Sequence, residues 1–175
     1  MLIEIEGKKL IEHTYAQLAA SAMDELVIVT GRDADEVAGL FPKQSSIIHN
    51  PDFEQGMTGS IQAGVRHSSE AHAYMICLGD MLWLKTGHYN ALIEQAKVSI
   101  EADEQAIVMP RVNGRPGNPV IFSSHYKADI LAHTESNGCK KIVQQNRQHL
   151  VYLESTEVAY LKDVDTPADL EKLNQ

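Results

Sequence analysis

Cysteine is scarce in this chain of 175 residues, which contains only Cys77 and Cys139 and no C-x-x-C pattern. The two thiols predict neither a zinc site nor a disulfide framework, and Cys77 is expected to act as a small apolar side chain. No apolar run approaches the roughly 18–20 residues that a membrane span needs, and no signal peptide is recognisable. We therefore expect a cytoplasmic protein without a membrane partner.

Basic residues are outnumbered, since 15 Lys and Arg face 24 Asp and Glu and give a formal net charge of −9. This balance argues against a nucleic-acid partner. A small anionic ligand remains compatible with it, because a metal ion and backbone N–H groups can hold phosphate locally. The sequence also contains no H-E-x-x-H zinc motif and no G-x-S-x-G nucleophile elbow, so neither of those hydrolytic sites is expected.

Short apolar segments alternate with amphipathic ones along the whole chain. The pattern predicts strands at 26–30, 46–49, 73–78, 106–109, 120–122 and 150–153, and helices at 9–22, 33–41, 61–67, 86–96, 126–133 and 138–145. Asp33 and Glu36 have the form of a reciprocal helix cap, and Pro110 is expected to end its strand. This alternation of strands and helices predicts a single α/β domain with a mostly parallel sheet and crossover helices.

The segment from Ala73 to Asp80 is the most informative part of the sequence. Its unbroken apolar run predicts a strand buried on both faces, and Gly79 then allows a turn. Asp80 would lie just beyond the carboxyl end of that strand, where open α/β sheets place their binding sites. A carboxylate there suits Mg²⁺, which prefers oxygen ligands and shares them with phosphate. The alternative is that Asp80 merely caps the following turn.

Two polar loops are further candidates for a site. Residues 50–60 (NPDFEQGMTGS) lead into a helix whose first N–H groups could bind an anion, although a simple capped helix explains the loop equally well. Residues 112–122 (VNGRPGNPVIF) contain two turn signals, and they form either a surface hairpin or part of a binding site.

Three stretches resemble, in this order, the motifs of the MobA-like nucleotidyltransferases, and most closely their molybdenum cofactor cytidylyltransferase branch. Asp80 is similar to the strand-terminal metal aspartate of that family. Residues 114–120 resemble its G-R-x-G-x-P-V loop, and residues 164–170 resemble its C-terminal D-x-D-T-P-x-D-L signature. The loop at residues 50–61 is similar to the one that meets the nucleotide. The resemblance runs from Met1 to the C-terminus.

The resemblance implies a three-layer α/β/α Rossmann-like domain of the GT-A-like type over residues 1–175. It also implies transfer of CMP from CTP to a pterin-type cofactor, with release of pyrophosphate and with Mg²⁺ as the expected cofactor. It assigns Asp80 and Arg115 to catalysis, Asp80 and Asp165 to the metal, Asn50, Gly56, Met57 and Ser60 to the nucleotide, and Gly114, Gly117, Asn118 and Pro119 to the acceptor. An equal alternative for Asp165 is that it only places a negative charge at the start of a helix.

The family opens with a strand and an A-A-G-x-S-x-R-x-G-x-x-K loop that wraps the triphosphate, and residues 1–175 do not contain this pattern. The resemblance therefore implies that the first strand of the sheet is missing from residues 1–175, and that they do not turn over CTP alone. Three hypotheses stay open: a cytidylyltransferase, an inactive family member that serves as a binding module, and a transferase with another NTP or acceptor. Homo-oligomer formation also stays open.

Overall fold

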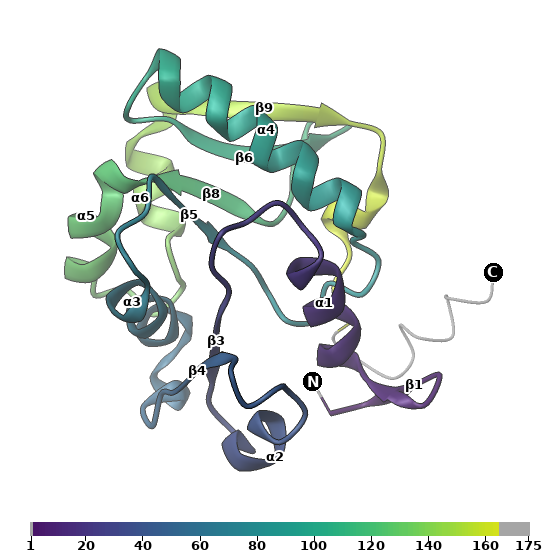
Figure 1. The fold of residues 1–175 in the computed structure, drawn as a ribbon. Coiled ribbons are helices and arrows are strands. Elements are labelled where there is room, and N and C mark those ends of the chain that lie inside the picture. Colours follow the sequence, from purple (N-terminus) through teal and green to yellow (C-terminus); the bar gives the residue numbers. More distant parts are fainter. Residues whose placement is uncertain (1, 165–175) are drawn as a thin grey trace.

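The computed structural model describes residues 2–164, which form a helix–strand succession over their whole length (Figure 1). The strands are β1 (Glu4–Ile5), β2 (Lys8–Lys9), β3 (Val27–Thr30), β4 (Ser46–His49), β5 (Ala73–Ile76), β6 (Ile107–Val112), β7 (Arg115–Pro116), β8 (Val120–Ser123) and β9 (Leu150–Ser155). The α-helices are α1 (Leu10–Ala19), α2 (Ala34–Ala38), α3 (Met57–His67), α4 (Thr86–Ala102), α5 (Lys127–Ala132) and α6 (Lys140–Gln145). Short 3₁₀ turns are η1 (Phe53–Gln55), η2 (Ser124–Tyr126), η3 (Arg147–His149) and η4 (Val158–Leu161).

The described strands form two sheets and one small hairpin. β3 and β4 pair in parallel, and β1 and β2 form the antiparallel hairpin. In the larger sheet the order is β5-β8-β6, and β7 and β9 both pair with β6. β8 is antiparallel to both of its neighbours while β9 is parallel to β6, so β5, β6 and β9 share one direction. The predicted α/β fold with a mostly parallel sheet is confirmed.

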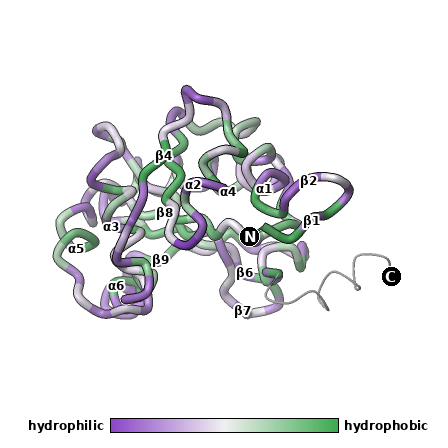
Figure 2. The backbone as a smooth tube through the Cα atoms, turned by 90° about the horizontal axis from the view of Figure 1, so that it is seen from below, coloured by the Kyte–Doolittle hydropathy of each residue, from purple (hydrophilic) through white to green (hydrophobic). Residues whose placement is uncertain are grey.

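Helices cover both faces of the larger sheet, which gives the three layers. Successive side chains of a strand point to opposite faces, and two separate apolar clusters follow from this alternation. Tyr74, Ile107 and Phe122 pack with α3, α5 and α6, whereas Met75, Val108 and Ile121 pack with α4. Figure 2 shows apolar residues in strands such as β8 and polar residues over many of the outer turns.

β6 continues through Pro110 to Val112, so the prediction that Pro110 ends its strand is wrong. The carbonyl of Pro110 accepts a hydrogen bond from the N–H of Gly117 at 2.9 Å. Because the N and C=O of a strand residue point to the same side, the missing N–H of Pro110 faces Gly117 rather than β9. The pairing with β9 therefore continues past the proline.

The predicted reciprocal cap of α2 is also wrong. Asp33 does precede the helix, but its φ is 58° and its side chain makes no capping hydrogen bond. Asp35 and Glu36 lie in the first turn instead, where negative charge is favourable next to the helix N-terminus. Among the helices of residues 2–164, none is long and apolar enough to cross a membrane.

Candidate functional site

Asp80 lies in the loop that follows β5, and its main chain holds the last described residues of the chain. The Asp80 carbonyl accepts hydrogen bonds from the N–H groups of Leu82 at 3.0 Å and Val164 at 3.1 Å. Leu10, Leu82 and Val164 form a small apolar cluster beside it. The loop after β5 is therefore fixed in place, and the chain leaves it at Val164. The predicted metal ligand Asp165 comes next and lies outside the described residues.

The second candidate loop begins with a tight hairpin between β6 and β7. Val112 pairs with Arg115, and the two residues between them, Asn113 and Gly114, have φ angles of 50° and 77°. A two-residue hairpin of this kind needs positive φ at both positions, which Asn-Gly adopts at little cost. Arg115 is exposed, and its side chain makes no hydrogen bond or ion pair with residues 2–164. Its guanidinium is thus available to an anionic ligand.

The end of this loop is tied to η4. The N–H of Asn118 donates to the carbonyl of Tyr160 at 2.9 Å, and Pro119, which follows a cis peptide bond, is fully buried. A Cβ on Gly117 would lie 2.4 Å from the Tyr160 carbonyl oxygen, so only glycine fits. Tyr160 itself donates its hydroxyl to the carbonyl of His88 at 3.0 Å. Burial raises the pKa of Tyr160 to about 12, which keeps it a neutral donor.

One segment therefore connects the two candidate loops. Tyr160 holds Asn118, and Val164, shortly after it, holds Asp80. This brings the loop after β5 and the loop after β7 to the same stretch of chain, although they are far apart in sequence. Their side chains are predicted to serve one site, and the main-chain contacts supply the framework for it.

The loop at residues 50–60 is held by its own hydrogen bonds and by contacts with residues 135–138. Asn50 is buried, donates its side-chain amide to the Ser60 hydroxyl at 3.0 Å and accepts the N–H of Asp52 at 3.1 Å. Gly56 has a φ of 111° and approaches Ser136 so closely that a Cβ would lie 2.5 Å from its carbonyl oxygen. The first N–H of α3, that of Met57, donates to the same carbonyl at 3.0 Å.

The Ser136 carbonyl satisfies the first N–H of α3, but no side chain caps this helix, so both interpretations of its start stay open. Thr58 adds a contact to the same neighbouring segment, since its hydroxyl donates to the Glu135 carbonyl and accepts the N–H of Gly138. An anion bound at the N-terminus of α3 would have to accept hydrogen bonds from N–H groups of the first turn that follow Met57. The assignment of Asn50, Gly56, Met57 and Ser60 to the nucleotide stays a prediction.

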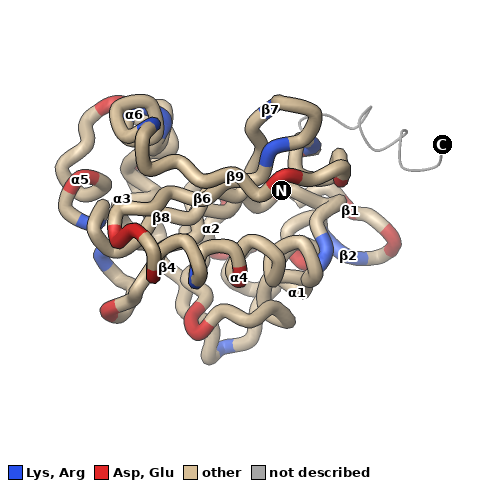
Figure 3. The backbone as a smooth tube through the Cα atoms, turned by 90° about the horizontal axis from the view of Figure 1, so that it is seen from above, with Lys and Arg blue, Asp and Glu red and all other residues tan. Residues whose placement is uncertain are grey.

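A metal ion at this site would depend on the substrate for ligands. Within residues 2–164, no three His, Cys, Asp or Glu side chains gather as a metal cluster. Mg²⁺ commonly binds through one or two carboxylates together with substrate phosphates. The single carboxylate of Asp80 fits this binding mode if a phosphate-bearing ligand lies beside it. It does not fit a site in which protein side chains supply all the metal ligands. Acidic and basic residues are interspersed along the chain (Figure 3), so any attraction of an anion is local.

Sequence periodicity alone did not locate two features of the structure. A cavity of about 1200 Å³ separates β3 from β5, and Met57, Ser60 and Gly79 lie on its lining. The start of α3 and the end of the segment that contains β5 therefore border the same cavity. Sequence periodicity carries no signal for such a gap, because both strands keep the apolar pattern of buried strands.

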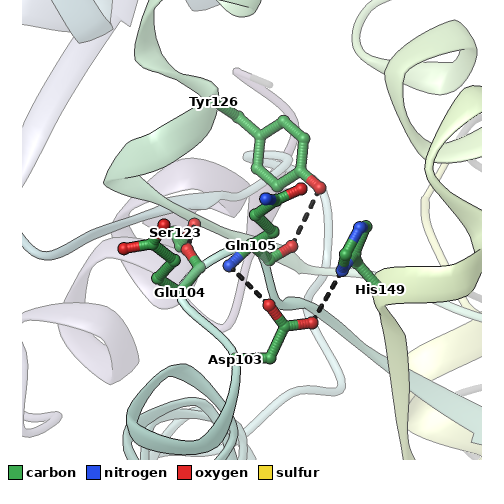
Figure 4. Close-up of polar contacts among 6 residues, drawn as sticks. All are labelled: Asp103, Glu104, Gln105, Ser123, Tyr126 and His149. Atoms are coloured by element: carbon green, nitrogen blue, oxygen red, sulfur yellow. Dashed lines mark hydrogen bonds and ion pairs between the residues drawn. The ribbon is translucent and has the colours of Figure 1, made fainter.

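The second is a polar cluster at the other end of the sheet, where β6 and β9 begin (Figure 4). Asp103 accepts a hydrogen bond from the N–H of Gln105 at 2.9 Å and pairs with His149 at 2.7 Å. Tyr126 donates its hydroxyl to the Gln105 carbonyl at 2.8 Å. The pKa of Asp103 is lowered, first by the bond to His149 and then by that to Gln105. These bonds join α4, β6, η2 and η3, so the cluster has a structural role.

Comparisons with known proteins agree on one family. The model of the MobA-like NTP transferase domain matches residues 1–150. Molybdenum cofactor cytidylyltransferase of Escherichia coli (strain K12) is 27% identical over 146 residues, which cover 82% of this chain and 71% of that protein.

Solved structures share the fold at lower identity. Rv0371c of Mycobacterium tuberculosis H37Rv has a TM-score of 0.82 at 18% identity, and the match covers 98% of this chain and 86% of that one. A complex of Rv0371c with manganese has a TM-score of 0.81 at 19% identity and covers 98% and 89%. A nucleotidyl transferase from Methanothermobacter (Mth528) has a TM-score of 0.80 at 18% identity and covers 98% and 82%.

Proposed function

Because the chain belongs to the MobA-like NTP transferase family, we propose that it transfers CMP from CTP to a molybdopterin-type cofactor and releases pyrophosphate. The observation that supports this most is the similarity to a molybdenum cofactor cytidylyltransferase over most of both chains. The geometry is compatible with it, since Asp80 and the loop from Gly114 to Pro119 are fixed to one segment between Tyr160 and Val164. Such a framework can hold two phosphate-bearing substrates next to each other.

The proposed reaction is an in-line displacement at phosphorus. A terminal phosphate oxygen of the pterin cofactor forms a bond to the α-phosphorus of CTP. The bond between the α-phosphorus and its bridging oxygen breaks, and pyrophosphate leaves with the electron pair. Both reactants already carry phosphate, so the protein mainly positions them and offsets negative charge.

Two side chains carry the proposed roles. Asp80 would hold Mg²⁺ together with the triphosphate, and Asp165 is proposed to share this role. A bound Mg²⁺ supplies a Lewis acid that draws charge from the phosphate oxygens. Arg115, exposed on the β6–β7 hairpin, would bind the phosphate of the acceptor through its planar fork of N–H donors.

Steady-state kinetics of pyrophosphate release test this assignment. Because residues 1–175 lack the triphosphate loop of the family, the assay uses them joined at Met1 to a strand and loop of the family's form. We expect Asp80→Asn to lower kcat about a hundredfold or more, since it removes the negative charge that holds the metal. Arg115→Ala should raise KM for the pterin acceptor and leave KM for CTP nearly unchanged.

Arg66→Ala is the matched control, because Arg66 is an exposed arginine in the last turn of α3. Its kinetic constants should equal those of the unchanged protein. Full activity of Asp80→Asn would refute the metal role of Asp80. Binding of CTP without any acceptor-dependent pyrophosphate release would favour a binding module over a transferase.

A further inference from the structure

Lys162 lies in the segment between Tyr160 and Val164, which connects the two candidate loops. The main chain is fixed on both sides of this lysine. The Tyr160 carbonyl accepts the N–H of Asn118 on one side, at 2.9 Å. The N–H of Val164 donates to the Asp80 carbonyl on the other side, at 3.1 Å. The backbone of Lys162 is therefore held between the loop that carries Asn118 and the loop that carries Asp80.

The side chain of Lys162 is directed toward the loop after β5. The backbone of Lys162 is extended, with φ −110° and ψ 129°, and in extended backbone alternate side chains point to the same side. Val164, two residues later, packs with Leu82, and Trp83 packs against the same apolar cluster. In agreement with this direction, the Lys162 Nζ lies 5.4 Å from the centroid of the Trp83 ring. A positive charge thus lies beside the loop that carries Asp80.

This charge is not neutralised by a carboxylate of the described chain. Lys162 is exposed, and its side chain makes no hydrogen bond or ion pair with any residue from 2 to 164, the adjacent Asp163 included. A cation–π contact at an exposed site is weak. A phosphate oxygen forms a stronger, charge-assisted bond with an ammonium group. An anion near the Asp80 loop can therefore draw the Lys162 side chain away from the ring.

A phosphate-bearing ligand at Asp80 needs such a local cation. The formal net charge of −9 provides no general attraction for an anion. The ammonium group of a lysine is a compact charge on a flexible stem, so it can reach phosphate oxygens at several positions. The alternative role for Lys162 is purely structural, in which its apolar stem only covers the Trp83 ring. The two roles differ in whether the binding of an anion depends on the charge.

We propose that Lys162 is a phosphate-binding residue, which moves from the Trp83 ring to the pyrophosphate part of a metal-bound nucleotide. The proposal rests on the proposed function in one respect, since it takes Asp80 as the residue that holds the metal. In the absence of ligand, Trp83 keeps the ammonium group next to the Asp80 loop. With nucleotide bound, Lys162 offsets the negative charge of the two phosphates that leave as pyrophosphate.

Binding of pyrophosphate in the presence of Mg²⁺ tests the proposal without any reaction. Trp83 is the only tryptophan of the chain, so the tryptophan emission reports on its ring alone. We expect pyrophosphate to change this emission in a saturable manner. Lys162→Met keeps an unbranched apolar stem and removes the charge, so it should raise the dissociation constant about tenfold or more and suppress the change in emission. Lys162→Arg should retain most of the affinity.

Calorimetry measures the same dissociation constants independently of the emission. Both measurements use residues 1–175, and a second sample uses the form that is joined to a strand and triphosphate loop. The expected effect of Lys162→Met is the same in both samples, because its partner Trp83 lies within residues 2–164.

Lys127 supplies the matched control. Its Nζ lies 5.8 Å from the centroid of the Tyr74 ring, so it makes the same kind of contact as Lys162. Tyr74 is the second residue of β5, whereas Asp80 follows the end of that strand. Lys127→Met removes one positive charge away from the Asp80 loop and should leave the affinity for pyrophosphate unchanged. The melting temperature of each variant confirms that it is folded.

The outcomes separate this proposal from the proposed function. Unchanged affinity of Lys162→Met would overturn the role of Lys162, even if Asp80→Asn abolished binding. Binding that leaves the Trp83 emission unchanged would also overturn it, and so would an equal loss of affinity in Lys162→Arg and Lys162→Met. The absence of pyrophosphate binding to both samples up to millimolar concentrations would have the same consequence. Weaker binding by Lys162→Met together with full binding by Asp80→Asn would support the role of Lys162 and refute the metal role of Asp80.

Discussion

At the scale of single residues, close main-chain approaches fix the candidate loops more firmly than side-chain bonds do. Gly117 is the clearest case, because the Tyr160 carbonyl occupies the place where a Cβ would be. This contact sets the position of the loop that carries Arg115 and Asn118. The sequence marked this glycine through its resemblance to a family loop, but the resemblance could not identify the carbonyl that requires it.

We predict that Gly117→Ala lowers the free energy of unfolding by about 1–3 kcal/mol, because a backbone carbonyl cannot move aside as a flexible side chain can. Gly87 is the control, since a Cβ there would meet nothing within 4 Å. Gly87→Ala in the first turn of α4 should be neutral or stabilising by up to about 1 kcal/mol. Urea unfolding of both variants measures the difference. Equal stability of the two variants would contradict the close contact.

The Asp103–His149 pair predicts a pH dependence of stability. The bond to His149 lowers the pKa of Asp103 below its ordinary value of 3.8. Folding is therefore stabilised by this carboxylate above that ordinary value, and the stabilisation is lost as the pH falls through the lowered pKa. With Asp103→Asn, the free energy of unfolding should fall less steeply as the pH decreases, as measured between about pH 2 and pH 6.

His149→Asn should reduce the same decrease in the free energy of unfolding at low pH in part. In a protein that already carries Asp103→Asn, it should have little further effect. The effect is small because 41% of the Asp103 side-chain surface is exposed to solvent, which screens the interaction. Additive effects of the two substitutions would show that the pair does not cause the acid dependence.

At the scale of elements, strand positions follow from the sequence more closely than element ends do. β4 was predicted at 46–49 and lies there, and β3 differs by one residue at its start. α3 begins at Met57 rather than at residue 61, because main-chain contacts with Ser136 hold its polar first turn. Local periodicity reports which residues are buried, whereas a helix start in a loop depends on a partner that is remote in sequence.

The loop after β5 depends on the apolar cluster of Leu10, Leu82 and Val164. We predict that Leu82→Ala costs about 2–3 kcal/mol of stability, toward the low end for a buried leucine because it lies near the surface. Hydrogen exchange should also speed up at residues 80–84, since the loop loses its anchor. Val98→Ala, at an exposed site of α4, should change neither quantity. Unaltered exchange at residues 80–84 in Leu82→Ala would contradict this role.

At the scale of the whole molecule, the sequence predicted the fold class and the family, and the structure and the comparisons confirm both. The alternation of helices and strands was sufficient to predict the fold class, and the order of three motifs was sufficient to predict the family. The spatial relation of the motifs could not be predicted, because Tyr160, which holds Asn118, belongs to no motif, and the motif that contains Val164 carries no signal for its hydrogen bond to Asp80. Sequence periodicity also did not locate the cavity between β3 and β5, although the resemblance implied that a strand of the sheet is missing from residues 1–175.

The central claim is that this fold transfers a nucleotidyl group through the site at Asp80. Transfer of label from CTP carrying radioactive phosphorus at the α-position to a molybdopterin acceptor, with Mg²⁺ present, tests it most directly. We predict labelled pterin product from residues 1–175 joined to a strand and triphosphate loop of the family's form, and none from residues 1–175 alone. Asp80→Asn in the joined form should lower labelling about a hundredfold or more. Labelling that is unaffected by Asp80→Asn would contradict this claim, and full labelling by residues 1–175 alone would contradict the expectation that they need the added strand and loop.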